Sequence, residues 1–438
     1  MNKLYVKKIF VYLFCLLTIL SAILSFRFNI NLSNIFGEYV LNEFLLNHDI
    51  QAKSGGSVSD ILVNWKYLQL LNSDINNLLL IELGKDTTLK NFPLHSIIFS
   101  QFDYLAKNIK NYLLIFFLFS FLIPFIFYLS LKEKFKNIDN LDLLVLVSLI
   151  IIFPSFQYSA IWGNSHNTSL IFFILSILFH QKLINQNYNS YNLQILTVFS
   201  LSLAAYTKQF YVFFFIFLLL DFFKNLKINN FIFILFFTTI LAVPGILFLI
   251  KNPLLLFGYK GETTNFFSSI LISSSIIFFY ILPFIIQEIY SKVKQNNFNI
   301  LSIFNYKIFT FSVLIFLISF VNFFYYGSIG GGAFYKLFVH LINIKFIFFI
   351  FSFLGIYFLF YFTKNQYRYY LLSIFLLTTF STGYWIFQKY FEIMFFFIFL
   401  FYYYDRSLKK EIEEKNLILV VYFSSYFIIS NFLYLANQ

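Results

Sequence analysis

The feature that most constrains this chain is the recurrence of long apolar runs along most of its length. An α-helix needs about 20 mostly apolar residues to cross the hydrocarbon of a bilayer. About thirteen runs approach that length, although several are short. They lie near residues 8–26, 112–131, 143–161, 168–180, 195–207, 210–223, 231–250, 267–287, 308–326, 344–362, 370–387, 390–404 and 416–434. The pattern predicts an all-α, polytopic membrane protein of about 13 transmembrane helices.

The amino-acid composition is also typical of an integral membrane protein. Apolar residues make up 60% of the sequence and charged residues 11%, whereas soluble proteins average about 45–50% and about 25%. This excludes a soluble enzyme, a nucleic-acid-binding protein and a disordered chain. The single cysteine, Cys15, excludes a disulfide framework and a thiolate metal site. We expect one integral-membrane domain over 1–438, with a first loop at 27–110 and the remaining bundle at 111–438.

The distribution of basic residues predicts the orientation, because Lys and Arg accumulate in short cytoplasmic loops. Basic residues precede the first run and then recur in alternate loops: Lys3, Lys7 and Lys8; Lys132, Lys134 and Lys136; Lys182; Lys224 and Lys227; Lys292, Lys294 and Lys307; Lys364 and Arg368; Arg406, Lys409, Lys410 and Lys415. We therefore expect a multi-pass protein of the cell (inner or plasma) membrane whose N-terminus is cytoplasmic. The loop at 27–110 is then extracytoplasmic.

That first loop is the only long polar stretch of the sequence. Two of its segments, 37–48 and 60–71, carry apolar residues at helical spacing and predict amphipathic helices on the outer surface. The Gly/Ser-rich segment at 53–57 separates them.

The strongest candidate for acid–base chemistry is Asp60, which follows the Gly/Ser turn and opens the run SDILVNWKYLQLL. A carboxylate held there can act as a general base, with Trp65 about one helical turn further on as a sugar-stacking surface. Glu38, closer to the first run, is the rival acid. The alternative to a catalytic role is a structural one, in which Asp60 or Ser59 caps the N-terminus of the helix.

Two further candidates lie on the predicted outer face. His95, in NFPLHS, follows Pro93 at the water–lipid boundary, where it can bond a phosphate or a sugar hydroxyl, or cap a helix. Lys208 is the one charge in a stretch of about 25 apolar residues, and it is costly there unless it meets an anion or reaches the headgroups. With Gln209 it suits a lipid-linked phosphate.

Other outer residues are secondary candidates. The segment 384–392, YWIFQKYFE, combines Lys389, Tyr390 and Glu392, which suits a sugar phosphate, although membrane-interface belts have a similar composition. Trp162 and His166 lie in WGNSH, and a Gly-rich segment follows at 327–336. The sequence contains no nucleotide-binding fingerprint, zinc motif or serine triad.

These features together resemble the GT-C superfamily of integral-membrane glycosyltransferases, which includes protein mannosyltransferases and bacterial lipid-A sugar transferases. The resemblance rests on four short motifs that span most of the chain: the early acid in SDILVNW, the Pro-containing return segment NFPLHS, the outward TKQ, and the late QKYFE. It implies transfer of a sugar from a polyprenyl-phosphate donor to a glycan, lipid or protein acceptor outside the cytoplasm.

Carried over to this sequence, the resemblance makes Asp60 the base and places His95 near the reacting phosphate or the acceptor. It implies that Lys208 and Lys389 hold the lipid phosphate. Two departures are visible. The first loop has no doubled Asp-Glu or Asp-x-Asp pair, so a divalent cation is possible but not indicated, and a single proline stands at position 93 where many members have two. No other cofactor and no nucleic-acid partner is expected.

Three other functions compete with this one. An O-antigen-type polysaccharide polymerase or ligase also uses lipid-linked sugars, but its large, Arg-bearing outer loop is expected late in the chain. A lipid or solute transporter or flippase is expected to show inverted repeats, interrupted helices and ionisable groups at mid-bilayer. A structural membrane protein without catalysis is the third alternative.

Overall fold

A computed structural model describes residues 8–9, 11–13, 15–17, 19–20, 57–76, 92–136, 138–251, 266–294, 304–325, 330–363, 366–379, 386–403 and 418–430. Over these residues the protein consists of helices and connecting turns, and no strand occurs among them. The all-α class predicted from the apolar runs is confirmed for the described part of the chain.

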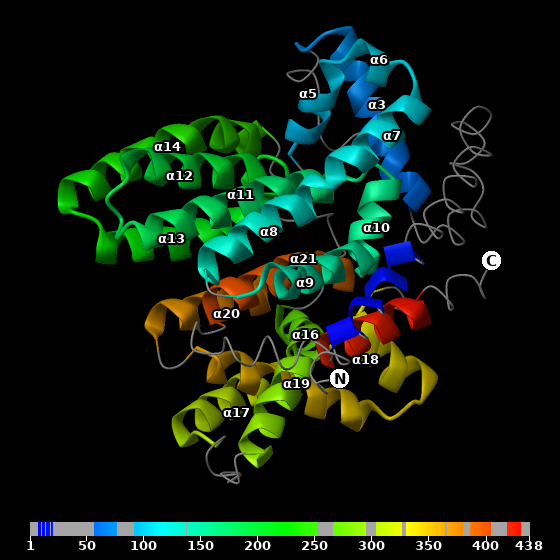
Figure 1. The fold of residues 1–438 in the computed structure, drawn as a ribbon, viewed down its shortest axis with the longest axis vertical. Helices are drawn as coiled ribbons and strands as arrows, with labels where there is room; N and C mark the ends of the chain where they lie inside the picture. The colour runs from blue at the N-terminus through cyan, green and yellow to red at the C-terminus, as the bar shows by residue number, and fades with distance from the viewer. Residues whose placement is uncertain are drawn as a thin grey trace. The chain divides into compact units, whose positions relative to one another are not determined.

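Figure 1 shows the helices in the order in which they follow one another along the chain. Their bounds are α3 Ser57–Ser73, α5 Leu94–Ser100, α6 Asp103–Ala106, α7 Ile109–Ser120, α8 Leu122–Lys134, α9 Asn140–Ile152, α10 Pro154–Ile161, α11 Ser165–Asn185, α12 Tyr191–Ala205, η1 Gln209–Phe213, α13 Phe214–Asn225, α14 Ile228–Lys251, α16 Phe266–Lys294, α17 Tyr306–Val321, α18 Gly332–Tyr335, η3 Lys336–Leu341, α19 Lys345–Tyr361, α20 Tyr367–Thr378, α21 Gln388–Ile398 and η4 Phe399–Tyr403. A last helix covers Ile418–Ser430.

Several of these helices can cross a membrane. By length and composition, four described helices qualify: Ile109–Lys134, Ser165–Asn185, Ile228–Lys251 and Phe266–Tyr290. A fifth span results if α9 and α10, which meet at a bend of 60°, count together. Four or five described helices thus have the length and the apolar composition of membrane spans, while the count of about 13 spans stays a prediction.

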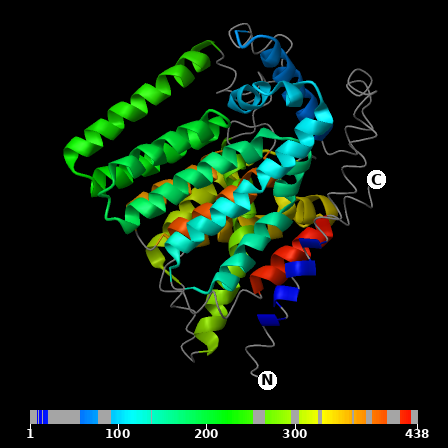
Figure 2. The same cartoon turned by 45° about the horizontal axis from the view of Figure 1, so that its top comes forward.

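The chain divides into two compact units. The first contains Met1–Tyr211, Phe237–Asn252 and Ile412–Gln438, and the second contains Val212–Phe236 and Pro253–Glu411. In the first unit α11 lies between α12 and α8, and α8 also packs on α9 (Figures 1 and 2). The expectation of a single domain over 1–438 stays a prediction.

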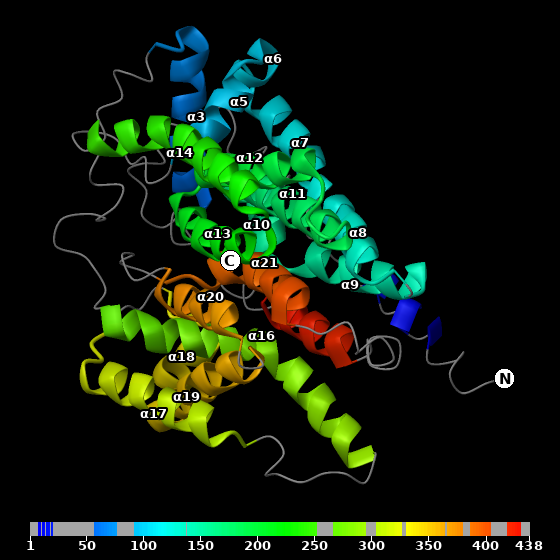
Figure 3. The ribbon, with the colours of Figure 1, turned by 90° about the vertical axis from the view of Figure 1, so that its left-hand side faces the viewer.

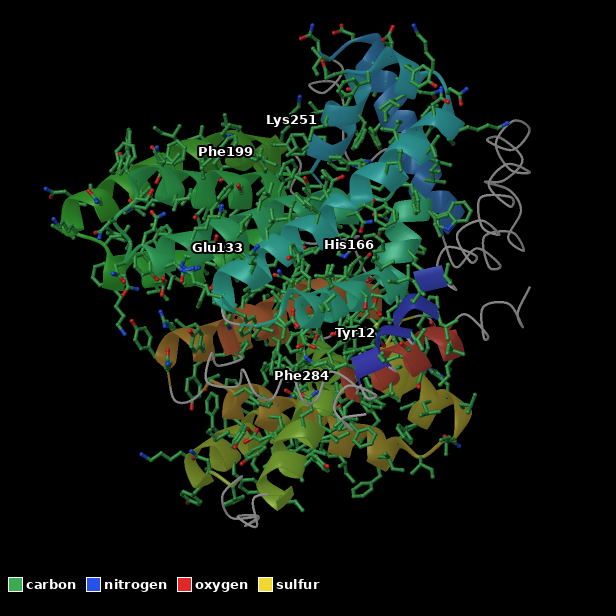
Figure 4. The ribbon with its side chains drawn as sticks, in the orientation of Figure 1. Tyr12, Glu133, His166, Phe199, Lys251 and Phe284 are labelled. Atoms are coloured by element: carbon green, nitrogen blue, oxygen red, sulfur yellow. The ribbon has the colours of Figure 1, made fainter. Side chains whose placement is uncertain are left out.

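In the second unit α16 is the central helix and contacts α17, α18, α19, α20 and α21 (Figure 3). Small residues allow its closest approach. A Cβ placed on Gly355 of α19 would overlap the backbone carbonyl oxygen of Ser274 in α16, so the two helices pack backbone to backbone, as small residues permit in membrane bundles. Phe284 of α16 is labelled in Figure 4, and its ring contacts Phe399 at 4.7 Å between centroids.

Most helix bounds lie within a few residues of the predicted runs, and two differ for a clear reason. The run predicted at 143–161 is two helices, because Pro154 opens α10 and leaves Phe153 in an extended conformation. The run predicted at 168–180 is longer than expected and fills Ser165–Asn185, since Asn164 caps its start.

Candidate functional site

The helices of the first loop are fixed to the bundle by an apolar cluster in the first unit. Trp65 of α3, Phe99 of α5 and the first two turns of α7 pack together. Trp65 is 3% exposed, and its ring lies 5.8 Å from that of Tyr112. The helix predicted at 60–71 is thereby confirmed, with its start three residues earlier at Ser57. The indole of Trp65 is packed against protein rather than open for sugar stacking.

Of the two acids proposed from the sequence, the structure describes only the backbone of Asp60. Asp60 lies in the first turn of α3, about 7 Å along the helix axis from Trp65 at about 1.5 Å per residue. Its side chain, like Glu38 and the helix predicted at 37–48, lies outside the described residues. The structure therefore places the backbone of Asp60 on a helix that is anchored to the start of α7 through Trp65.

His95 lies at the centre of a buried hydrogen-bond chain that joins three helices. Its Nε2 lies 2.7 Å from the hydroxyl of Tyr112 and its Nδ1 lies 2.9 Å from Oγ1 of Thr168. The Tyr112 hydroxyl donates to the carbonyl oxygen of Gly163 at 2.7 Å. Since that hydroxyl has one hydrogen, it accepts from Nε2–H, and Thr168 donates to Nδ1. We call His95, Tyr112, Thr168 and Gly163 the His95 cluster.

The imidazole of His95 is neutral. Burial, and secondly the nearby ammonium of Lys208, lower the pKa of His95 from 6.5 to about 3. Both side chains are buried, with His95 2% and Lys208 5% exposed. The structure thus brings together two residues that are more than a hundred positions apart in sequence. One is a buried cation, and the other is a neutral ring whose two nitrogens are engaged.

The turn between α10 and α11 completes the His95 cluster. Gly163 has a φ of +59°, and a Cβ there would lie 2.5 Å from the ring of Tyr112. Glycine is required because the Tyr112 ring occupies that space. Trp162 is buried before the turn. His166, labelled in Figure 4, is buried in the first turn of α11, where its backbone N–H donates to Oδ1 of Asn164 at 3.1 Å.

Lys208 lies in a tight turn after α12. Its backbone N–H donates to the carbonyl oxygen of Ala204 at 2.9 Å, and its carbonyl accepts from the N–H of Tyr211 at 3.2 Å. Gln209 begins the 3₁₀ helix η1. Because a 3₁₀ turn follows the helix at once, the backbone on both sides of Lys208 is held in place.

No family model, no curated protein and no solved structure matches this chain. The resemblance to membrane glycosyltransferases therefore rests on the residues quoted above.

The candidates from the segment 384–392 belong to a separate hydrogen-bond network in the second unit. Oε1 of Glu392 accepts from the hydroxyl of Tyr280 at 2.9 Å, and that hydroxyl accepts from Nε2 of Gln388 at 2.9 Å. Oε1 of Gln388 accepts from the N–H of Ala333 at 2.7 Å. Glu392 is 1% exposed. We call Ala333, Gln388, Tyr280 and Glu392 the Glu392 network.

Lys389 is next to this network on the first turn of α21. Its ammonium lies 5.1 Å from the ring centroid of Phe387 and 5.7 Å from that of Tyr390, within the range of cation–π attraction. Gly330, Gly331 and Gly332 all have positive φ, and the N–H of Gly331 donates to the carbonyl of Ile386 at 2.8 Å. The Gly-rich segment noted in the sequence thus fixes the start of α21.

Sequence reasoning found His95 and Lys208 but missed three of their neighbours. In the sequence Tyr112 and Thr168 are parts of predicted apolar runs, and the one local signal at Gly163 is that the glycine in WGNSH favours a turn. Within the described residues, no three side chains among His, Cys, Asp and Glu gather where they could hold a metal ion.

Proposed function

We propose that the chain is an integral-membrane glycosyltransferase that moves a sugar from a polyprenyl-phosphate donor to a cell-envelope glycan, lipid or protein on the extracytoplasmic face. In this proposal the protein spans the membrane about 13 times, and the helices of the first loop cover the outer end of the bundle. The observation that carries the proposal is the buried ammonium of Lys208 beside neutral His95, in the same unit as the anchored helix that carries Asp60.

The roles follow from charge. Asp60 accepts the proton of the acceptor hydroxyl while the hydroxyl oxygen bonds to the anomeric carbon. The bond from that carbon to the phosphate oxygen breaks, and the polyprenyl phosphate leaves with the electron pair. Lys208 stabilises the charge that develops on this phosphate, and its effect is strong because the site is poor in water.

His95 has a supporting role in this proposal. Its nitrogens bond Thr168 and Tyr112, so it holds α5, α7 and α11 together beside Lys208. A neutral ring there also avoids a second positive charge next to the ammonium. Lys389, which the resemblance also assigns to the lipid phosphate, and its neighbour Tyr390 belong to the second unit, and their role in binding stays a prediction.

Two observations favour a second candidate function. Glu392 is a buried carboxylate within the helices of the second unit, and α9 and α10 form an interrupted helix in the first. Buried ionisable groups and broken helices are typical of transporters. A transporter would move lipid or solute across proteoliposomes without forming a glycosidic bond.

The test uses the full chain in proteoliposomes with a radiolabelled polyprenyl-phosphate hexose and detergent-extracted envelope acceptors. Asp60→Asn is expected to lower sugar transfer by about 100-fold or more, since the proton of the acceptor then has no base. Asp103→Asn is the matched control. Asp103 is an exposed acid of the same loop whose carboxylate pairs with Lys107 at 2.8 Å, and its loss should leave transfer unchanged. Full turnover in Asp60→Asn, or label crossing the bilayer without transfer, would contradict the proposal.

A further inference from the structure

Tyr206 makes an unusual contact with the backbone of another helix. It follows the last residue of α12, and its hydroxyl donates to the carbonyl oxygen of Leu241 in α14. The same hydroxyl accepts from the N–H of Gly245 at 3.1 Å. In an uninterrupted α-helix, the N–H of residue 245 pairs with the carbonyl of residue 241. The side chain of Tyr206 therefore bridges a donor and an acceptor of the α14 ladder.

The sequence of α14 provides the place for this bridge. Pro244 lies inside the helix, and an internal proline removes a hydrogen bond and opens the ladder around it. Gly245 follows, and a Cβ on it would lie 3.2 Å from the Tyr206 ring, closer than an ordinary van der Waals contact. The Pro-Gly pair thus both opens the ladder and leaves room for the tyrosine.

Tyr206 is also tied to the helix that carries His95. Its carbonyl oxygen accepts from the N–H of Leu94 at 3.3 Å. The ring of Phe92 lies 5.9 Å from that of Tyr206 and 5.4 Å from that of Phe248 in α14. Phe92, just before α5, therefore contacts both Tyr206 after α12 and Phe248 near the end of α14. Lys251, the last residue of α14, is labelled in Figure 4.

The helix on the other side of this contact is a candidate membrane span. α14 has 24 residues, and among them only Ile234 is buried. Its apolar side chains are accordingly open to the lipid. Tyr206 thus joins a lipid-facing helix to the turn that presents Lys208 two residues later.

We propose that Tyr206 is a positioning residue that sets the ammonium of Lys208 for the phosphate of a lipid-linked donor. The hydroxyl fixes the turn that carries Lys208 to α14, a candidate membrane span, so the position of the cation depends on this contact. This inference rests on the proposed function, in which Lys208 binds the donor phosphate.

The experiment measures binding of undecaprenyl phosphate to the full chain in phosphatidylethanolamine nanodiscs. Tyr206→Phe keeps the ring and removes both hydrogen bonds of the bridge, and is expected to raise the Kd between about threefold and tenfold, since the cation is displaced but not lost. Lys208→Met is expected to raise it more, since the charge itself is lost. Inorganic phosphate at the same concentration should not displace the lipid, and displacement by it would overturn the assignment of a lipid-linked ligand.

A double variant separates positioning from stability. In Tyr206→Phe/Pro244→Ala the helix can pair its own backbone groups again, so the melting temperature should recover while the Kd stays raised. Recovery of both would overturn the positioning role, because Tyr206 would then act only through the stability of α14. Normal binding in Tyr206→Phe with weakened binding in Lys208→Met would overturn this inference alone. Normal binding in Lys208→Met would overturn the proposed donor site itself.

Discussion

Each of the two units buries a series of linked hydrogen bonds. The two series differ in the charge of the groups that they contain. In the His95 cluster every member is neutral: an imidazole, two hydroxyls and a backbone carbonyl. In the Glu392 network the last acceptor is a carboxylate, reached through Tyr280 from an amide and a backbone N–H. In the first unit the buried ammonium of Lys208 lies beside the His95 cluster rather than within it.

This difference indicates what each arrangement can do. A neutral cluster with both histidine nitrogens engaged is a support that holds its helices together. A network whose donors all point toward one carboxylate stabilises that carboxylate and fixes the helices that present it. The proposed donor site is accordingly the one at Lys208, and we regard the Glu392 network as the element that orients the first turn of α21.

The most direct way to sharpen this comparison is to remove one hydroxyl from each unit. Tyr280→Phe is expected to lower the free energy of unfolding by about 2–3 kcal/mol, because hydrogen bonds to carboxylates are the stronger ones. Tyr112→Phe should cost about 1–2 kcal/mol, since its partners are neutral. Thermal unfolding in a mild detergent measures both.

Exposed tyrosines of the same units provide the controls for this pair. Tyr104→Phe in the first unit and Tyr306→Phe in the second should have little effect, as both side chains are exposed. A cost at Tyr112 larger than that at Tyr280 would contradict the assignment of the stronger acceptor to the second unit.

A smaller effect is expected on the free energy of unfolding when the pH is lowered, and the group responsible is His95 of the first unit. The lowered pKa of His95, about 3, means that the folded protein holds the ring neutral while the unfolded chain binds a proton below about pH 6.5. Stability from this source is complete above that pH, and it is lost as the pH falls from 6.5 toward 3. At about pH 5.5 the loss is about 1–2 kcal/mol.

The measurement compares unfolding at about pH 7.5 and about pH 5.5 for the wild type and for His95→Gln. The variant should lose less stability on acidification, because glutamine does not titrate. His340→Gln, which removes an exposed histidine of the second unit, should keep the wild-type pH dependence. An unchanged slope in His95→Gln would show that His95 is not held neutral by the fold.

The sequence was sufficient to predict the helical class and the position of most helices. The length of the apolar runs predicts the bounds of α14 and α19 to within three residues. The run predicted at 231–250 is the helix Ile228–Lys251, and the run predicted at 344–362 is the helix Lys345–Tyr361. The break at Pro154 was missed, because a single proline in an apolar run is also compatible with a continuous, kinked span.

The candidate site could be predicted only in part. The sequence marks Lys208 because it is an isolated charge in an apolar stretch, and it marks His95 because a histidine follows Pro93 just before an apolar stretch. Their neighbours could not be found from the sequence: Thr168 is 73 positions from His95, and nothing local in its helix marks it as a hydrogen-bond partner. The bridge from Tyr206 to α14 depends likewise on three-dimensional contact, although the Pro-Gly pair at 244–245 is a visible signal of a helix distortion.

The central claim is that the first-loop helices and Lys208 face the side of the membrane on which lipid-linked sugars are used. Single cysteines, introduced in a Cys15→Ser background, test this at the two ends of the span Ile109–Lys134. Asp103 and Lys136 are both exposed. With a membrane-impermeant maleimide, cysteine at position 103 should react in intact cells, and cysteine at position 136 only after permeabilisation. Reaction in the reverse order would put the first loop in the cytoplasm and contradict the proposed donor and its site.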